Sequence, residues 1–207
     1  MNVKDGKQHL EAISGKREVI LNGSVIRHVV DHPAFRNSCQ TVAALYDFQA
    51  REENLELMTY ETPTGHRANR AWQLPRSHEE LVQKRKAMTA WAELHGGFMG
   101  RSPDHLANAI AGQVIGLDVF EKHGAKYAKA YWDYYEYARD NDIFLTYVII
   151  NPQADRTKAW GEQTSENLTA HIVDEDTTGI TIRGAKMLGT SSIMAQEVFV
   201  ANLQPLR

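Results

Sequence analysis

The hydrophobic pattern of this sequence changes its period near Asn141. Before that point, apolar residues recur every three or four positions, as they do in amphipathic helices. After it, the run IFLTYVII is continuously apolar and rich in β-branched residues, and the segments LTAHIV and GITIRG alternate between apolar and polar positions. The change predicts an α+β fold, with a mainly helical domain in residues 1–140 and a β domain in residues 141–207.

Capping and turn residues subdivide the helical region. A capping box at residues 77–80 predicts the start of one helix. Apolar spacing predicts four more helices, at about 6–13, 34–50, 104–120 and 125–140. Asn22-Gly23 and the turn at residues 63–65 each lie between short strand-like segments, which predicts two small β-hairpins within the helical domain.

Two groups in these helices are interpreted as core. Cys39 lies at helical spacing from Val42 and Tyr46. The helix at 125–140 carries a tyrosine stripe, Tyr127, Tyr131, Tyr134 and Tyr135. Such a stripe is more often core with polar tips than a ligand site, so we interpret it as core.

Composition excludes several classes of function. The net charge is −3, and no basic run is longer than residues 84–86, which argues against a nucleic-acid partner. The single cysteine, Cys39, excludes an internal disulfide and a cysteine-based zinc site, and we expect no metal. The N-terminus lacks the apolar segment of a signal peptide, and no apolar run is long enough to span a membrane. We expect a cytoplasmic protein without a membrane partner.

The β region yields only about four predicted strands before it stops at residues 203–207. So few strands make a poor independent sheet, and their edges would be exposed. We therefore expect that the sequence is the front part of a longer chain.

Residues 96–105, GGFMGRSPDH, contain more than a helix start needs. A helix start needs a capping residue and often a proline, whereas this stretch adds adjacent glycines and Arg101. It is not a phosphate-binding loop, because the glycine spacing is one residue short and Arg101 stands where lysine is required. We interpret the surplus as functional. The structural alternative is that Arg101 and Asp104 cap the helix and pair with each other.

Five sequence motifs, which we also call phrases, follow one another in a fixed order along the chain. They are HPAFRNS (32–38), LMTYETPTG (57–65), GFMGRSPDH (97–105), NDIFLTYVIINPQADRTK (141–158) and GITIRGAKMLGTSS (179–192). In order and spacing they resemble the flavin-dependent phenol hydroxylases of the 4-hydroxyphenylacetate 3-hydroxylase type, which are the oxygenase half of a two-component system.

The resemblance implies a three-domain fold similar to that of the acyl-CoA dehydrogenases. A helical N-terminal domain is followed there by a β-barrel and then by a four-helix bundle, which closes the flavin site and forms dimers or tetramers. This chain would then hold the first domain and the start of the barrel, and the C-terminal bundle would be missing from it.

The resemblance also implies a substrate pocket beside the flavin, lined by Arg101 and His105. Arginine stays charged and can hold a phenolate or reduced flavin, and histidine titrates near neutrality and can take a phenol's proton. In the family the position of Tyr147 is commonly histidine and that of His105 is commonly tyrosine, so the two are exchanged here. We predict Arg101, His105 and Tyr147 as catalytic. The exchange favours a related phenol, a halogenated or nitro-phenol, or a carrier-bound tyrosine over 4-hydroxyphenylacetate itself.

The family's flavin contacts fall on two other segments. They correspond to Gln153, Ala154, Asp155, Arg156 and Thr190. Polar groups at strand ends suit the edge of a flavin ring, and an arginine suits its diphosphate. The structural alternative for Asp155 and Arg156 is a salt bridge within a turn.

The implied reaction is hydroxylation of a phenol ortho to its hydroxyl group. A separate flavin reductase supplies reduced FAD, which reacts with molecular oxygen to give a hydroperoxyflavin. Two alternatives stay open from the sequence: a flavin enzyme of the acyl-CoA dehydrogenase type that oxidises an acyl thioester, and a non-catalytic, truncated helical binding module.

Overall fold

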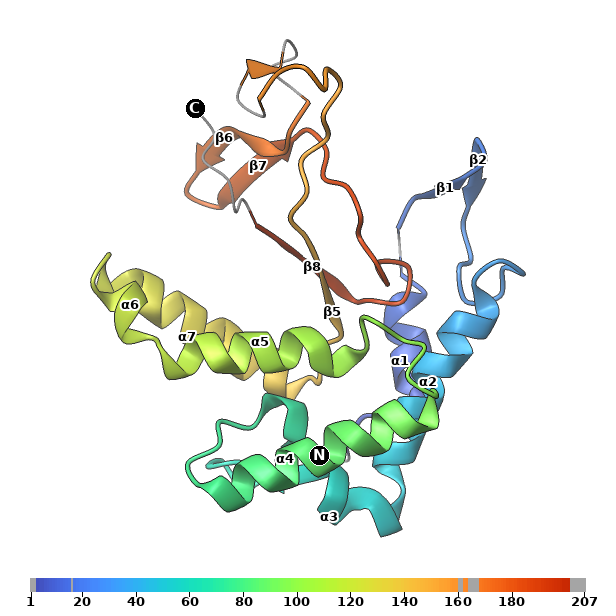
Figure 1. The fold of residues 1–207 in the computed structure, drawn as a ribbon, viewed down its shortest axis with the longest axis vertical. Coiled ribbons are helices and arrows are strands. Elements are labelled where there is room, and N and C mark those ends of the chain that lie inside the picture. The colour runs from blue at the N-terminus through green and yellow to red at the C-terminus, as the bar shows by residue number, and fades with distance from the viewer. Residues whose placement is uncertain (1–2, 16, 160–161, 164–167, 202–207) are drawn as a thin grey trace.

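A computed structural model describes residues 3–15, 17–159, 162–163 and 168–201. Helices and short hairpins make up the chain to residue 140, and the strands β5 to β8 follow (Figure 1). The α-helices are α1 (Gly6–Ile13), α2 (Arg36–Ala50), α3 (Leu55–Met58), α4 (His78–Leu94), α5 (Pro103–Ile115), α6 (Asp118–Glu121) and α7 (Ala125–Asp140), and the 3-10 helices are η1 (Glu52–Asn54) and η2 (Arg70–Trp72).

The helix ends follow from local sequence. Asp5 and Gln8 form a reciprocal capping box at α1, and the Ser77 hydroxyl accepts the Glu80 amide at the start of α4. The helix predicted at 104–120 ends earlier, because α5 stops at Ile115 with Gly116 as its C-cap, and the short α6 follows.

The strands form four two-stranded sheets among the described residues. The N-terminal hairpins are β1 (Val19–Leu21) with β2 (Ser24–Ile26), and β3 (Thr59–Glu61) with β4 (Arg67–Asn69), both antiparallel as predicted. In the C-terminal part, β6 (His171–Asp176) pairs antiparallel with β7 (Gly179–Arg183), and β5 (Leu145–Val148) pairs in parallel with β8 (Glu197–Val200). The register of the parallel pair sets Tyr147 opposite Phe199.

The main hydrophobic core lies where α5, α7, η2 and β5 meet. It contains Leu106 and Ile110 of α5, Tyr135 of α7, Trp72 of η2 and Leu145 of β5. The Tyr135 hydroxyl donates to the Trp72 carbonyl at 2.6 Å, so its polar tip is satisfied inside the core. This core fixes the first turns of α5 against β5.

The interpretation of core residues was right in part. Cys39 is fully buried, as predicted. Of the tyrosine stripe, Tyr135 is buried and Tyr131 and Tyr134 are half-buried, but Tyr127 is 53% exposed and does not belong to the core. Tyr127 lies in the first turn of α7, beyond the stretch of that helix that packs on α5.

A buried polar network joins the helices to β5. Asp142 is buried, with a φ of 44°, and its carboxylate accepts from Gln49 of α2 at 2.6 Å. Lys4 donates to the Asp142 carbonyl at 2.8 Å and also to the Gln196 side chain. Because Gln196 leads into β8, the network sets where β5 and β8 leave the helices.

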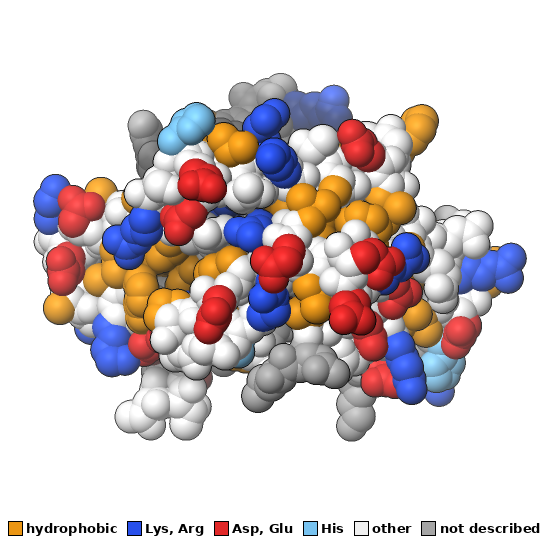
Figure 2. All heavy atoms as spheres, turned by 90° about the horizontal axis from the view of Figure 1, so that it is seen from below, with side chains coloured by type: hydrophobic (Ala, Val, Ile, Leu, Met, Phe, Trp, Pro, Cys, Tyr) orange, Lys and Arg blue, Asp and Glu red, His pale blue; other side chains and the backbone are white. Residues whose placement is uncertain are grey.

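The face seen from below carries hydrophobic, acidic and basic side chains side by side (Figure 2). No single charge dominates it. Within the described ranges, no helix has both the length and the apolar character that crossing a membrane requires.

Candidate functional site

The loop between α4 and α5 brings Arg101 to the start of α5. Gly96 and Gly97 have φ values of 62° and 74°, a left-handed backbone that glycine adopts without a steric penalty. The Gly97 amide donates to the Ala92 carbonyl and thereby ends α4. Pro103 begins α5, which places Arg101 just before the helix and His105 in its first turn.

The structure brings Arg101, His105 and Tyr147 together. The His105 and Tyr147 rings are stacked, with centroids 5.6 Å apart and planes inclined by 29°. The Arg101 guanidinium lies over the Tyr147 ring, with Cζ 5.1 Å from the ring centroid. We call these three residues the Arg101 cluster. The cluster joins the loop before α5, the helix itself and β5.

The capping alternative for Arg101 does not describe what this side chain does. Its Nη1 donates to the Gly100 carbonyl at 2.8 Å, and Asp104 accepts from the Ser102 hydroxyl instead. Among the described residues, Arg101 and Asp104 form no ion pair. The charge of Arg101 is therefore not neutralised by a carboxylate within the described part of the chain.

The electrostatic surroundings of His105 favour its neutral form. Burial lowers the pKa of its imidazole, the Arg101 charge lowers it further, and Asp104 opposes the two. A neutral imidazole has a free nitrogen lone pair, so His105 can accept a proton near neutral pH.

Thr190, one of the predicted flavin contacts, lies beside this cluster. The Thr146 hydroxyl donates to the Thr190 carbonyl, which ties the turn at residues 189–195 to β5 next to Tyr147. The neighbouring Ser191 hydroxyl donates to the Arg101 carbonyl at 3.0 Å. Sequence reasoning missed Thr146 and Ser191. Ser191 belongs to the phrase GAKMLGTSS, but nothing in the sequence distinguishes it from its hydroxyl-bearing neighbours.

The other predicted flavin contacts lie in a separate loop after β5. The Asp155 carboxylate accepts from the Thr157 amide and hydroxyl at 2.9 and 2.6 Å, and these donors lower the pKa of Asp155. Its ion-pair partner is Lys158, at 3.7 Å, rather than Arg156. Gln153 donates to the Lys158 carbonyl at 3.0 Å, and Ala154 and Arg156 are exposed.

This loop does not meet the Arg101 cluster directly. Within the described ranges, no hydrogen bond, ion pair or ring contact joins residues 153–156 to Arg101, His105 or Tyr147. The tertiary structure therefore places Thr190 with the predicted catalytic residues and leaves Gln153, Ala154, Asp155 and Arg156 apart from them.

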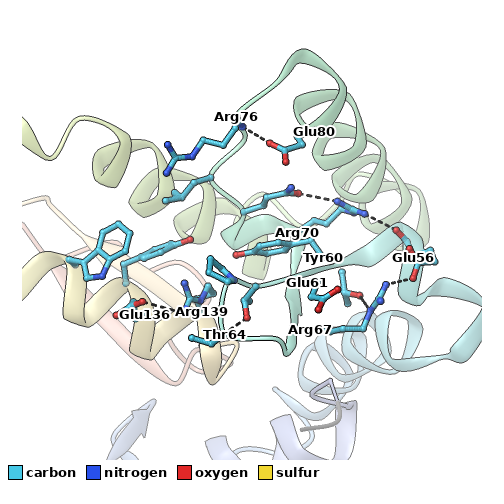
Figure 3. A pocket seen from close by; sticks show the side chains of 17 residues that line it. Glu56, Tyr60, Glu61, Thr64, Arg67, Arg70, Arg76, Glu80, Glu136 and Arg139 are labelled. Atoms are coloured by element: carbon cyan, nitrogen blue, oxygen red, sulfur yellow. Dashed lines mark hydrogen bonds and ion pairs between the residues drawn. The ribbon is translucent and has the colours of Figure 1, made fainter.

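A polar cavity of about 890 Å³ lies elsewhere, between the β3–β4 hairpin, the start of α4 and α7 (Figure 3). Its lining contains as many glutamates as arginines. Arg67 pairs with Glu56, Arg70 donates to the carbonyls of Leu57 and Glu56, and Arg139 pairs with Glu136 at 3.5 Å. Two of these arginines pair with glutamates, whereas Arg101 pairs with no carboxylate among the described residues, so the Arg101 cluster is the better candidate site.

Comparison with known proteins identifies a family that the chain matches. Residues 5–207 match the family model described as 4-hydroxyphenylacetate 3-hydroxylase N terminal. The chain is 37% identical, over 97% of its length, to the 4-hydroxyphenylacetate 3-monooxygenase oxygenase component of Geobacillus sp. (strain PA-9), and 31% identical, over 98% of its length, to the 4-nitrophenol 2-monooxygenase oxygenase component of Rhodococcus sp..

The fold is also found among solved structures. The oxygenase component of a 4-hydroxyphenylacetate 3-monooxygenase, solved in complex with FAD, superposes with a TM-score of 0.88 at 30% identity. That comparison covers 98% of this chain and 42% of the other chain. The chain spans 40% of the length of the Geobacillus relative and 38% of that from Rhodococcus.

Proposed function

This chain belongs to the 4-hydroxyphenylacetate 3-hydroxylase family, whose N-terminal part it matches, and from that premise we propose that its protein is an FAD-dependent phenol monooxygenase. It would act as the oxygenase component of a two-component system, with a separate reductase delivering reduced FAD. The observation that carries the proposal is the Arg101 cluster, in which a guanidinium and a neutral imidazole meet on one tyrosine ring.

The proposed domain organisation follows from the same premise. Residues 1–140 would form the helical N-terminal domain, and residues 141–207 would supply the first strands of a β-barrel. The position of the helices supports this division, since every helix of eight residues or more in the described part of the chain ends by Asp140. A C-terminal four-helix bundle, through which the subunits form a dimer or tetramer, would complete the protein.

The residues present suit a flavin. Thr190 offers an exposed hydroxyl beside the Arg101 cluster, where the flavin ring would meet the substrate. Arg156 offers an exposed guanidinium to the diphosphate, and Gln153 an amide. Gln153, Ala154, Asp155, Arg156 and Thr190 are therefore the residues that would hold FAD. Reduced FAD, when bound, would supply the activated oxygen atom that enters the ring.

Each member of the cluster has a distinct task in this proposal. The Arg101 charge holds the phenol oxygen and stabilises its ionised form, which makes the ortho carbon more nucleophilic. His105 accepts the hydroxyl proton at a ring nitrogen, because its lowered pKa keeps that nitrogen unprotonated. The Tyr147 ring fixes both side chains through stacking and cation–π contact, and its hydroxyl can share the substrate oxygen.

The test is product analysis with the complete protein, a flavin reductase, FAD and ¹⁸O₂. The panel contains 4-hydroxyphenylacetate, 4-nitrophenol and halogenated phenols, because the exchanged His105 and Tyr147 favour a related phenol. We expect a catechol that carries one ¹⁸O atom ortho to the original hydroxyl. Oxidation of an acyl thioester without incorporation of oxygen would replace the proposal with a dehydrogenase activity, and inertness toward every substrate would favour a binding module.

A further inference from the structure

The turn at residues 189–195 has a backbone that needs outside support. Ser191 has a φ of 67°, and Leu188, just before the turn, has a φ of 62°; both lie in the left-handed region that side chains with a Cβ disfavour. Within the turn, the Met194 and Ala195 amides both donate to the Ser191 carbonyl at 2.9 Å. Strained conformations of this kind persist where the surrounding structure fixes them.

Arg17 supplies that support from the opposite end of the sequence. Its Nη1 lies 3.2 Å from the Ser192 carbonyl, 3.2 Å from the Ile193 carbonyl and 3.0 Å from the Ala195 carbonyl. Across the part of the chain that the structure describes, Arg17 forms no ion pair with a carboxylate. Its charge is thus committed to the carbonyl groups of this one turn.

The other side of the turn holds the candidate site. The Ser191 hydroxyl donates to the Arg101 carbonyl at 3.0 Å, and the Thr190 carbonyl accepts from Thr146, the residue before Tyr147. A shift of the turn would therefore move the main chain of Arg101 and release its link to β5.

We propose that Arg17 is a positioning residue for the Arg101 cluster and that it acts through Ser191. Arg17 touches none of the three cluster residues among the contacts of the described chain. Arg17 fixes the carbonyls of residues 192, 193 and 195, and this holds Ser191 in its left-handed conformation. Ser191 in turn holds the loop that carries Arg101. The inference rests on the proposed function only for its kinetic consequence, because the mechanical link is a property of the fold.

The first test is hydrogen exchange, which does not depend on activity. In the complete protein, Arg17→Met should speed exchange of the amides in residues 190–195 and 100–102 by about tenfold or more, because the opening of both segments becomes easier. Arg27→Met is the matched control, an exposed arginine of the same N-terminal region, and should leave both segments unchanged. Faster exchange in 190–195 alone would overturn the proposal, since Arg17 would then hold only its own turn.

The second test is a double-mutant cycle on turnover of 4-nitrophenol, or of whichever phenol the wild-type protein converts. Ser191→Gly removes the hydroxyl while permitting the left-handed backbone. Arg17→Met and Ser191→Gly should each lower kcat by about ten- to a hundredfold, since a small misplacement of a catalytic group has effects of this size. The kcat of the double variant should lie within about twofold of that of the slower single variant. Arg17→Lys should recover part of the wild-type kcat.

The two tests separate the possible failures. Multiplying effects in the double variant would show that Arg17 and Ser191 act independently, which would overturn this inference while the phenol hydroxylase remains. If the wild-type protein converts no phenol, the proposed function fails, and the exchange experiment alone decides whether Arg17 controls the Arg101 loop.

Discussion

His105 and Tyr147 stack on each other with ring centroids 5.6 Å apart, although one belongs to a helix and the other to a strand. Both elements are anchored in one core, since Leu106 follows His105 and Leu145 precedes Tyr147 by two positions. The contact is therefore held by the packing of α5 on β5. In the function we propose, this contact would let an imidazole and a phenol reach one substrate oxygen, whichever segment carries which group.

Loss of the imidazole should reveal its role. His105→Ala should lower kcat by about a hundred- to ten-thousandfold, the usual cost of removing a general base. Flavin affinity should stay within about twofold, because the predicted flavin contacts lie on other segments. The wild-type rate should fall as the pH drops through the lowered pKa of His105, since protonation removes its lone pair, and this acidic limb should be absent from the variant.

The measurement is kcat/KM for the phenol as a function of pH. His123→Ala is the control, an exposed histidine away from the cluster, and should keep both the rate and the limb. An acidic limb that survives in His105→Ala would assign the titration to another group.

The exchanged pair can be converted to the order that we expect for the family. His105→Tyr alone leaves two phenols and Tyr147→His alone leaves two imidazoles, so each single variant lacks one of the two functional groups. The double variant regains both, and its kcat should exceed that of either single variant by about tenfold or more. Steady-state turnover of the four proteins decides this. If the two single losses in kcat multiply in the double variant, the position of each group matters more for turnover than its chemical identity.

Arg101 should dominate phenolate binding. Arg101→Met should weaken binding of 4-nitrophenolate by about ten- to a hundredfold, the range for a hydrogen bond to a charged group. Arg101→Lys should be intermediate, because an ammonium group keeps the charge but not the planar face that lies over Tyr147. An absorbance titration measures the affinity, with the exposed Arg85→Met as control. Equal affinities of Arg101→Met and the wild-type protein for 4-nitrophenolate would show that Arg101 does not bind the phenolate.

His9 should make the fold sensitive to acid. It is fully buried, stacks on Tyr46 at 4.7 Å, and neither ring nitrogen has a hydrogen-bond partner of normal geometry among the described residues. Burial, followed by the Lys4 charge, lowers its pKa from 6.5 to about 3. The folded state therefore holds His9 neutral, and the unfolded state binds its proton first as the pH falls.

Its contribution to stability is thus present above pH 6.5 and is lost toward about pH 3. The free energy of unfolding should fall by about 1.4 kcal/mol for each pH unit within that window. His9→Phe keeps the stacked ring and should abolish this slope, whereas the exposed His123→Phe should not. Urea unfolding at several pH values measures the effect, and an unchanged slope in His9→Phe would assign the acid sensitivity to other groups.

Sequence reasoning found the helices and hairpins because their signals act on the chain next to them. Asn22-Gly23 in the first hairpin and the capping Ser77 each redirect or satisfy the backbone within a few residues. The five ordered sequence motifs indicated the family for a similar reason, since a sequence motif can be recognised without knowing which residues lie near it in the fold. The family model then matched residues 5–207.

Only the tertiary structure decided which segments meet. The parallel pairing of β5 with β8 brings together strands from opposite ends of the β region, and no local propensity specifies that partner. For the same reason the sequence grouped Thr190 with Gln153 and Arg156, whereas the fold sets Thr190 beside the Arg101 cluster.

The same distinction explains Arg17 and Ser191. An arginine after a helix and a serine in a turn are ordinary residues until folding sets the guanidinium on three carbonyls and the hydroxyl on Arg101. By itself, the sequence determined the elements and the chemical groups available to this protein. Hydrogen bonds between distant segments depend on the closure of long loops and on shared packing, so the tertiary structure alone determined which of those groups work together.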